Sequence, residues 1–461
     1  MINELPSDLL LSIQTYLKDD DFLSFLSTTR ELHLLKEKVY WKKEIVYKYS
    51  LTDISYYKQL NLTYKGSKHI PPFIKTLTLD SSPTQGIPNT ITTLRFDVGF
   101  VYFITKIPNY VRTLHLGFGF FARMKRGFIP NSVKKLHLGT KFDQPLTPGI
   151  IPNSVVHLDF GQLFNQELNP GDIPNSVQTL YLGHSFNKPL RPGVIPNSVT
   201  YLHFGFSFSQ YLKPGDIPDS VVTLHIEYFN NDITSLEGII PNSVKTLHLQ
   251  YFDGGSLAKV IPRFVETLFL SKESHSLIKG DIPNSVTRLH LGSTYNSSLI
   301  PGYIPDSVEI LHLGMFFNKP LKKGSIPNSV RILHLGICFN RVLKKGDIPN
   351  SVTTLILSVH YNKPLKKGVL PDSVDTLYVS ECYTYLQDLN LPKSVKTLIL
   401  NNTAYLPLKK GDIPESVTLL YLPESSNKNL YVGYIPHTTM TVSNRTENYW
   451  NNFFNDPVIN F

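Results

Sequence analysis

The sequence contains almost no cysteine, because only Cys338 and Cys382 occur among its 461 residues. Two cysteines so far apart in the chain exclude a disulfide-rich scaffold and a zinc site built from several thiolates. Their small number favours a reducing compartment, and we expect a cytoplasmic protein. Charged residues are also scarce, at 18%, whereas apolar residues make up 41% of the chain, so most of it can fold.

Signals for export, membrane insertion and catalysis are missing as well. The amino terminus has no basic segment before an apolar one, so we expect no signal peptide. No apolar run approaches the roughly 18 residues of a membrane-spanning helix, and we expect no membrane partner. The sequence has no phosphate-binding glycine loop, no paired metal-ligand motif and no nucleophile elbow. We therefore expect a protein that is not an enzyme and that holds no cofactor or metal.

What the sequence has in abundance is one repeated phrase, roughly I-P-N-S-V-x-x-L-H-L-G-x-x-F-N-x-P-L-x-x-G. Its proline recurs from Pro88 to Pro436 with a period of about 22 residues, and a first copy stands at Pro71. A repeat of this length cannot bury its apolar side chains alone, so successive repeats must stack. The period predicts a solenoid of about 17 coils over residues 71–440, with a cap or tail over residues 441–461.

One repeat, residues 129–149, indicates how a coil should fold. Pro130 lacks an N–H group and starts a turn, because proline presets the turn conformation. Leu136, His137 and Leu138 alternate apolar, polar and apolar, as in a short strand with one buried face. Gly139 ends this strand where the chain must turn sharply. Two further side chains on the return path should join the core: Phe142 and Leu146.

Each coil should therefore hold one short strand, since too few residues remain for a long helix. Stacked strands about 4.8 Å apart would form a continuous parallel sheet. The asparagine that follows the phenylalanine should form a ladder with the backbone of neighbouring coils. The members of this ladder are Asn165, Asn187, Asn318, Asn340 and Asn362.

The letters V-x-x-L-x-L followed by turn residues resemble the leucine-rich repeat. More specifically, the Phe-Asn and Ile-Pro pairs resemble the FNIP repeat, which is found in proteins of social amoebae and of giant amoeba-infecting viruses. The resemblance covers about residues 71–440. It implies a leucine-rich-repeat-like solenoid that binds proteins, in the host cytoplasm if the protein is viral. A parallel β-helix is the alternative architecture, because the repeat does not fix the number of strands in a coil.

Between the two buried leucines, one side chain of each strand must point out of the sheet. This position forms a column with one member in each coil. Eight of its members are histidine, although the chain has only 15 histidines. Histidine stacks, hydrogen-bonds and titrates near neutrality, so it suits an adaptable binding face. We predict that a target protein contacts these members of the column: His115, His137, Asp159, Tyr181, His203, His225, His248, Phe269, His290, His312, His334 and Tyr378.

Two other roles for the column stay open. Its rings can form a ladder that only fills the sheet surface. Neighbouring rungs such as His225 and His248 can in principle share a metal ion, but the column lacks the carboxylate and cysteine ligands that would complete a site beside them. We therefore expect no metal in this column.

Residues 1–50 lack the repeat. Apolar residues recur at helical spacing, and Ser7-Asp8 suits a helix start, so we expect short helices. This order resembles the F-box, which opens with Leu-Pro, keeps leucine and isoleucine at these helical positions and ends near a tryptophan, here Trp41. The resemblance implies contact with a Skp1-type adaptor, and through it with a cullin, by Leu5, Pro6, Leu9, Ile13, Leu17 and Leu23. Alternatively, these helices only cap the first coil, as the end of any solenoid requires.

Together these features predict a mixed fold: an α-helical F-box-like domain over residues 1–50, a linker or cap over residues 51–70, and then the solenoid. The function that follows is substrate recognition for a Skp1–cullin–F-box ubiquitin ligase. The alternative is a scaffold without a link to ubiquitin. Nucleic-acid binding is a weaker hypothesis that rests on paired lysines before a glycine, such as Lys322-Lys323 and Lys344-Lys345. We expect those lysines to form a solvated loop edge.

Overall fold

The computed structural model describes most of the repeats. The described residues are 45–46, 61–64, 75–79, 87–96, 107–120, 123–229, 238–252, 257–270, 277–379, 390–400, 411, 413–423 and 435–444. The six expected adaptor contacts and most of the carboxyl-terminal cap or tail lie outside them. The chain divides into two compact units, Met1–Gln210 and Tyr211–Phe461.

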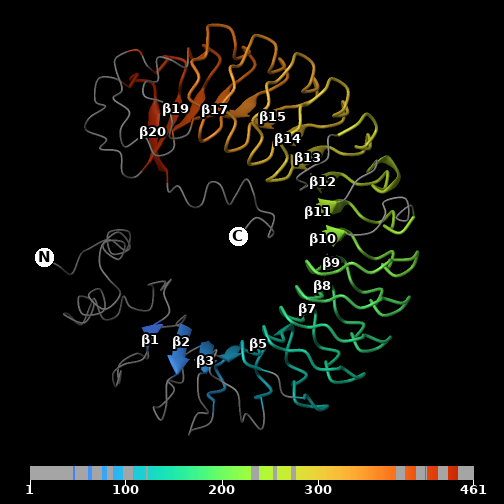
Figure 1. The fold of residues 1–461 in the computed structure, drawn as a ribbon. Coiled ribbons are helices and arrows are strands. Elements are labelled where there is room, and N and C mark those ends of the chain that lie inside the picture. The colour runs from blue at the N-terminus through green and yellow to red at the C-terminus, as the bar shows by residue number, and fades with distance from the viewer. Residues whose placement is uncertain are drawn as a thin grey trace, which may run out of the picture. The chain divides into compact units, whose positions relative to one another are not determined.

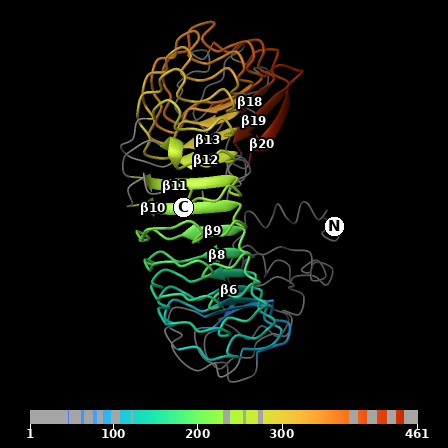
Figure 2. The same ribbon diagram turned by 90° about the vertical axis from the view of Figure 1, so that its right-hand side faces the viewer.

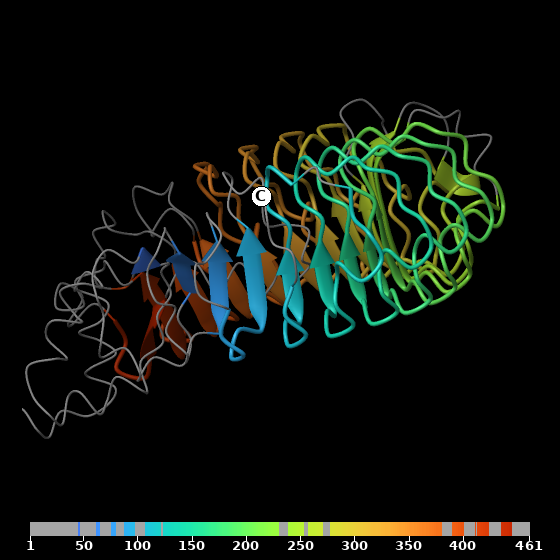
Figure 3. The same ribbon diagram turned by 90° about the horizontal axis from the view of Figure 1, so that it is seen from below.

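The first unit is a stack of short parallel strands, one above the next (Figure 1). Each strand pairs in parallel with the strand that follows it in the sequence. The register is constant, because Leu114 pairs with Leu136, and Leu136 with Leu158. Figure 3 shows the blue and cyan strands of this unit side by side, with their return paths beside them. The strands are β1 (Ile45–Val46), β2 (Asn61–Tyr64), β3 (Thr76–Leu79), β4 (Thr93–Phe96), β5 (Thr113–His115), β6 (Lys135–His137), β7 (His157–Asp159), β8 (Thr179–Tyr181) and β9 (Tyr201–Phe204).

The second unit repeats the same arrangement. Its strands also pair in parallel with their sequence neighbours, and the strands from β10 to β13 are seen stacked in Figure 2. One short 3-10 helix, η4 (Leu257–Lys259), lies between β11 and β12. The strands are β10 (Thr223–Phe229), β11 (Thr246–Phe252), β12 (Thr267–Leu270), β13 (Arg288–Leu291), β14 (Ile310–His312), β15 (Ile332–His334), β16 (Thr354–Ile356), β17 (Thr376–Val379), β18 (Thr397–Leu400), β19 (Leu419–Pro423) and β20 (Met440–Asn444).

The spacing of the strands confirms a parallel β-solenoid with a period of about 22 residues. From β5 to β18 the strands follow one another at nearly constant intervals, which makes about 13 regular turns. The two intervals before them are shorter, because β3 begins at Thr76, β4 at Thr93 and β5 at Thr113. Where the return path is described, each coil holds one strand, which favours the leucine-rich-repeat-like architecture over a β-helix. β1 and β2 carry no copy of the phrase, and the sequence did not predict them.

A fixed set of hydrogen bonds closes each coil onto the one before it. In the coil of residues 129–149, the Val133 amide donates to the Pro130 carbonyl at 3.1 Å, which forms the expected proline turn. The Ser132 hydroxyl donates to the Val111 carbonyl of the preceding coil at 2.7 Å. The same serine bond recurs through both units, from Ser154, Ser176, Ser198, Ser243, Ser285, Ser307, Ser329, Ser351, Ser373 and Ser394. These serines are structural clamps.

The core consists of columns of identical side chains, as the phrase predicts. Leu136, Leu138 and Phe142 are fully buried, and Leu146 nearly so. Phenylalanine rings stack along the coils at centroid distances of 6.0 to 6.1 Å in the first unit, through Phe142, Phe164, Phe186 and Phe208. The rings of Phe164 and Phe186 are packed on both sides by their equivalents, so the column holds neighbouring coils together.

The expected asparagine ladder is confirmed. The amide oxygen of Asn165 accepts a hydrogen bond from the Asn187 amide at 2.9 Å. Asn318 likewise accepts from the Asn340 amide at 3.0 Å, and Asn340 from the Asn362 amide at 3.2 Å. Asp143 takes the same place one coil before Asn165. The described return paths form no strands, so their backbone N–H groups need other partners. The asparagine side chains supply these partners.

Candidate functional site

The side-chain column of the first unit lies on strands β3 to β9, opposite the buried leucines. Successive residues of a strand point to opposite faces, so the residue between two leucines must lie on the other face. His115 and His137 pair across neighbouring strands, and their rings stack at 4.2 Å with an angle of 3° between their planes. The side chains of His137 and Asp159 are 27% and 33% exposed, so both can be reached by a partner.

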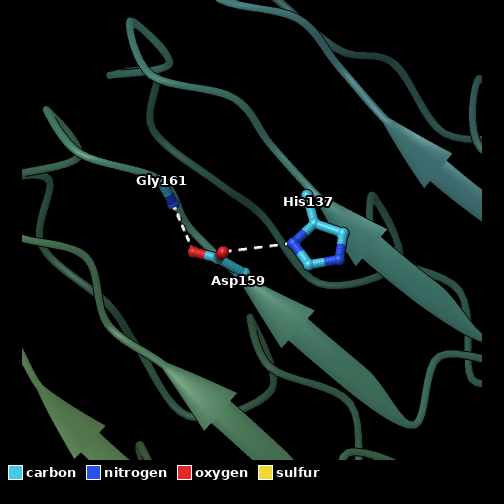
Figure 4. A network of polar contacts seen from close by, with 3 residues as sticks. All are labelled: His137, Asp159 and Gly161. Carbon is cyan, nitrogen blue, oxygen red and sulfur yellow. Dashed lines mark hydrogen bonds and ion pairs between the residues drawn. The ribbon is translucent and has the colours of Figure 1, made fainter. Parts of the chain in front are cut away.

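A polar network centres on Asp159 (Figure 4). Its Oδ2 atom lies 3.1 Å from Nδ1 of His137, and its Oδ1 atom accepts a hydrogen bond from the Gly161 amide at 2.8 Å. Burial alone would raise the pKa of Asp159, but the hydrogen bonds from His137 and Gly161 outweigh it, so the pKa is lowered. An ionised carboxylate only accepts hydrogen bonds, so Nδ1 of His137 carries the proton and the Asp159 contact fixes the orientation of the ring.

A second row of side chains joins the column on the same face, one position before each first leucine. The His157 ring lies 5.4 Å from His137 and 5.4 Å from Tyr181. Tyr181 also contacts Tyr201 and His203, each at a centroid distance of 5.3 Å. The sequence-based prediction missed His157 and Tyr201. The signal was available, because residues two apart in a strand share a face.

The histidines beside this network are neutral at neutral pH. Burial, together with smaller effects of the neighbouring His137 and Arg95, lowers the pKa of His115 to about 3. Burial and the proximity of His137 also lower the pKa of His157. These two rings therefore present neutral stacking surfaces, and the fixed charges beside them come from Asp159 and Arg95.

The column of the second unit is also continuous, but more deeply buried. His225 and His248 stack at 3.7 Å, His248 and Phe269 at 3.8 Å, and Phe269 and His290 at 4.2 Å. His225 is only 1% exposed and His312 only 7%. Ile356, Tyr378 and Ile399 form an apolar cluster on the following strands, against which Tyr421 packs. The alternation of the sequence predicted the direction of these side chains but not their burial.

Burial also keeps the later histidines of this column neutral. The pKa of His312 is well below its usual value because of burial and the neighbouring His290 and His334. Burial lowers the pKa of His334 to about 4. Neutral, buried rings stabilise the sheet by stacking, so the structural role that the sequence left open for the column applies to this unit. Binding of a target by the column remains a prediction.

The chemistry available to this face is stacking and hydrogen bonding. Among the described residues, no group of three or more His, Cys, Asp or Glu side chains is arranged to hold a metal ion. In the same part of the chain, no helix is long and apolar enough to cross a membrane. The half-exposed network around Asp159 is the part of the column where charge, hydrogen-bonding groups and aromatic rings meet.

The geometry of the coils agrees with a comparison to protein families. The model of the FNIP repeat matches residues 123–163, 164–207, 208–252, 274–316, 317–359, 339–382 and 361–403, more than half of the chain. The chain belongs to the FNIP repeat family. The expected FNIP repeats are thus confirmed. The most regular residues of the repeat form the turns, strands and stacked rings described above. No curated protein sequence matches this FNIP repeat protein significantly.

A solved structure supports the leucine-rich-repeat-like fold of the FNIP repeats. The structure of CroV588, described as a novel circular LRR protein, is 27% identical over 79% of this chain, with a TM-score of 0.58. The match covers 58% of the CroV588 chain, so the present chain spans little more than half of that protein. YopM from Yersinia enterocolitica is 15% identical over 79% of this chain and 77% of its own, with a TM-score of 0.35.

Proposed function

We propose that this protein is a non-catalytic interaction solenoid that recognises a target protein through the column of the first unit. The observation that carries the proposal is the half-exposed network of His137 and Asp159, flanked by the rings of His115, His157 and Tyr181. Repeat solenoids of this kind typically act as interaction modules, because stacked repeats present an extended surface. The proposal places the protein in the cytoplasm, in keeping with its low cysteine content.

The finer proposal is that residues 1–50 connect this solenoid to a ubiquitin ligase. Their resemblance to the F-box supports it, with Leu5 and Pro6 at the Leu-Pro start. A Skp1-type adaptor would bind these residues, and a cullin would bind the adaptor. The solenoid would then hold the target near the transferred ubiquitin, so its contribution would be proximity rather than chemistry.

A scaffold without a ubiquitin link is the second candidate, and one observation favours it. Strands β1 and β2 extend the sheet to Ile45, where β1 pairs with β2 and β2 with β3. The segment before the repeats thus supplies strands that cover the open end of the first repeat, which is what a cap does. In this case residues 1–50 would support the solenoid without binding an adaptor.

Quantitative co-purification from the native cell tests both levels of the proposal. The Leu5→Ala/Pro6→Ala variant should lose the Skp1-type adaptor and keep the target. The His137→Ala/Tyr181→Ala variant should recover at least tenfold less target than the wild type and should keep the adaptor. Leu163→Ala is the matched control, because this side chain lies in the same unit but outside the column and is 48% exposed. It should retain both partners.

Two outcomes contradict the proposals. If the wild type and the Leu5→Ala/Pro6→Ala variant bind the adaptor equally, or if neither binds it, the ligase role is lost and the scaffold remains. If the His137→Ala/Tyr181→Ala variant recovers the same proteins as the wild type in the same amounts, the column of the first unit is not the recognition surface.

A further inference from the structure

The positive charge of the protein is concentrated in three consecutive coils of the second unit. Residues 314–368 contain ten basic residues and one acidic residue, Asp347. This excess of nine equals the formal net charge of the whole chain, +9. The Asp347 carboxylate is buried and accepts a hydrogen bond from the Lys344 backbone amide at 2.7 Å, so it is directed at the backbone of its own turn.

Six lysines of this region occupy the same two positions of three stacked turns. All six side chains are exposed, and within the described part of the chain none forms an ion pair: Lys322, Lys323, Lys344, Lys345, Lys366 and Lys367. We call these residues the lysine rows. The coils that carry them are in register, since Phe317, Phe339 and Tyr361 stack at 6.0 Å from one coil to the next. The lysines therefore recur at the same two positions from one coil to the next along the stack.

The fold does not require lysine at these positions. In four earlier coils the same two positions hold Thr147-Pro148, Asn169-Pro170, Arg191-Pro192 and Lys213-Pro214. The residue at the second position packs against the glycine of the next turn, whether that residue is proline or lysine. Atoms of Pro148 lie 3.5 Å from a Cβ built on Gly171, and atoms of Lys323 lie 3.6 Å from one built on Gly346. Stacked like charges repel each other, so the lysine rows do not serve stability.

We propose that the lysine rows form a docking surface for an acidic segment of a partner protein, one rich in aspartate and glutamate. Lysine is a compact point charge on a flexible stem, which suits an extended acidic chain without fixed geometry. Surfaces for single-stranded nucleic acids combine basic residues with aromatic rings on which bases stack. The turns that carry the lysine rows, residues 319–325, 341–347 and 363–369, contain no aromatic residue. This surface lies on the return paths and is independent of the histidine column.

The test replaces the rows with the sequence that the protein itself uses elsewhere. Lys322, Lys344 and Lys366 become threonine, and Lys323, Lys345 and Lys367 become proline, as in the turn of Thr147 and Pro148. The control replaces all six lysines by arginine and keeps the charge. Fluorescence anisotropy measures binding to a labelled poly-glutamate peptide and to a labelled oligothymidylate of equal charge, at low and at physiological salt.

The wild type and the arginine control should bind the peptide. The threonine–proline variant should bind it with at least tenfold lower affinity. A second neutral variant, with all six lysines replaced by glutamine, should show the same loss and does not depend on new prolines. Equal binding by the glutamine variant and the wild type, or no binding by the wild type, would overturn the proposal. Tighter binding of the wild type to the oligothymidylate than to the peptide would also overturn it, in favour of a nucleic-acid surface.

Discussion

Gly161→Ala should destabilise the first unit far more than Gly127→Ala, although both glycines have the same left-handed backbone. Their φ angles are +82° and +81°. An alanine at either site costs about 1–2 kcal/mol for this conformation. At Gly161 the added Cβ would also lie 1.9 Å from the carbonyl oxygen of Gly139 in the preceding coil, whereas at Gly127 nothing lies within 4 Å. Relieving this contact requires the coils to separate, which should cost about 1–3 kcal/mol more.

Hydrogen exchange measures this difference locally, which suits a repeat protein whose coils open in separate steps. We expect faster exchange of the β6, β7 and β8 amides in Gly161→Ala than in Gly127→Ala. The Gly161 amide also supports Asp159, so the same substitution should loosen the network that holds His137. Equal exchange in the two variants would show that the close stacking of glycines does not hold the coils together.

Acidification should destabilise the second unit through its buried histidines. In the unfolded chain a histidine binds a proton below about pH 6.5. In the folded chain His334 binds one only below about pH 4, because burial lowers its pKa to about 4, and the pKa of His312 is also well below its usual value. The unfolded state therefore binds more protons as the pH falls from about 6.5 to about 4. For His334 this amounts to roughly 2 kcal/mol of lost stability at pH 5.

The His312→Ile/His334→Ile variant should lose less stability between pH 7.5 and pH 5 than the wild type. Isoleucine fits this column, because Ile356 pairs in register with His334 and is 2% exposed. Phe269→Ile is the matched control, since it changes packing in the same column without removing a titrating group. Chemical denaturation at both pH values, followed by hydrogen exchange of β13 to β16, measures the effect. The same loss in the wild type and the double variant would contradict the role assigned to these rings.

Much of the solenoid could be predicted because each coil repeats the same chemistry. Pro130, Gly139 and Phe142 mark the turn, the end of the strand and the core in one copy, and stacking applies that pattern to the others. The asparagine ladder followed from the same logic. The alternation of side chains along a strand also predicts that His115 and His137 lie on one face of the sheet.

The rest depended on the surroundings in three dimensions. Alternation fixes the face on which His225 lies, but its exposure of 1% depends on what packs around that face. The row of His157 and Tyr201 was missed because threonine fills this position in most coils, so these two aromatic side chains do not appear in the repeated phrase. β1 and β2 carry no repeated phrase, and only their pairing with β3 reveals them as strands.

Histidine-directed covalent labelling, read by mass spectrometry, tests the central claim most directly. The labelled forms are the free protein and the complex that it forms with its target from the native cell. Recognition by the column of the first unit predicts that binding protects His137 and His157 from the label, while the exposed His184, which lies after the strand β8, stays equally labelled and serves as the internal reference. Unchanged labelling of His137 and His157 in the complex would contradict the account.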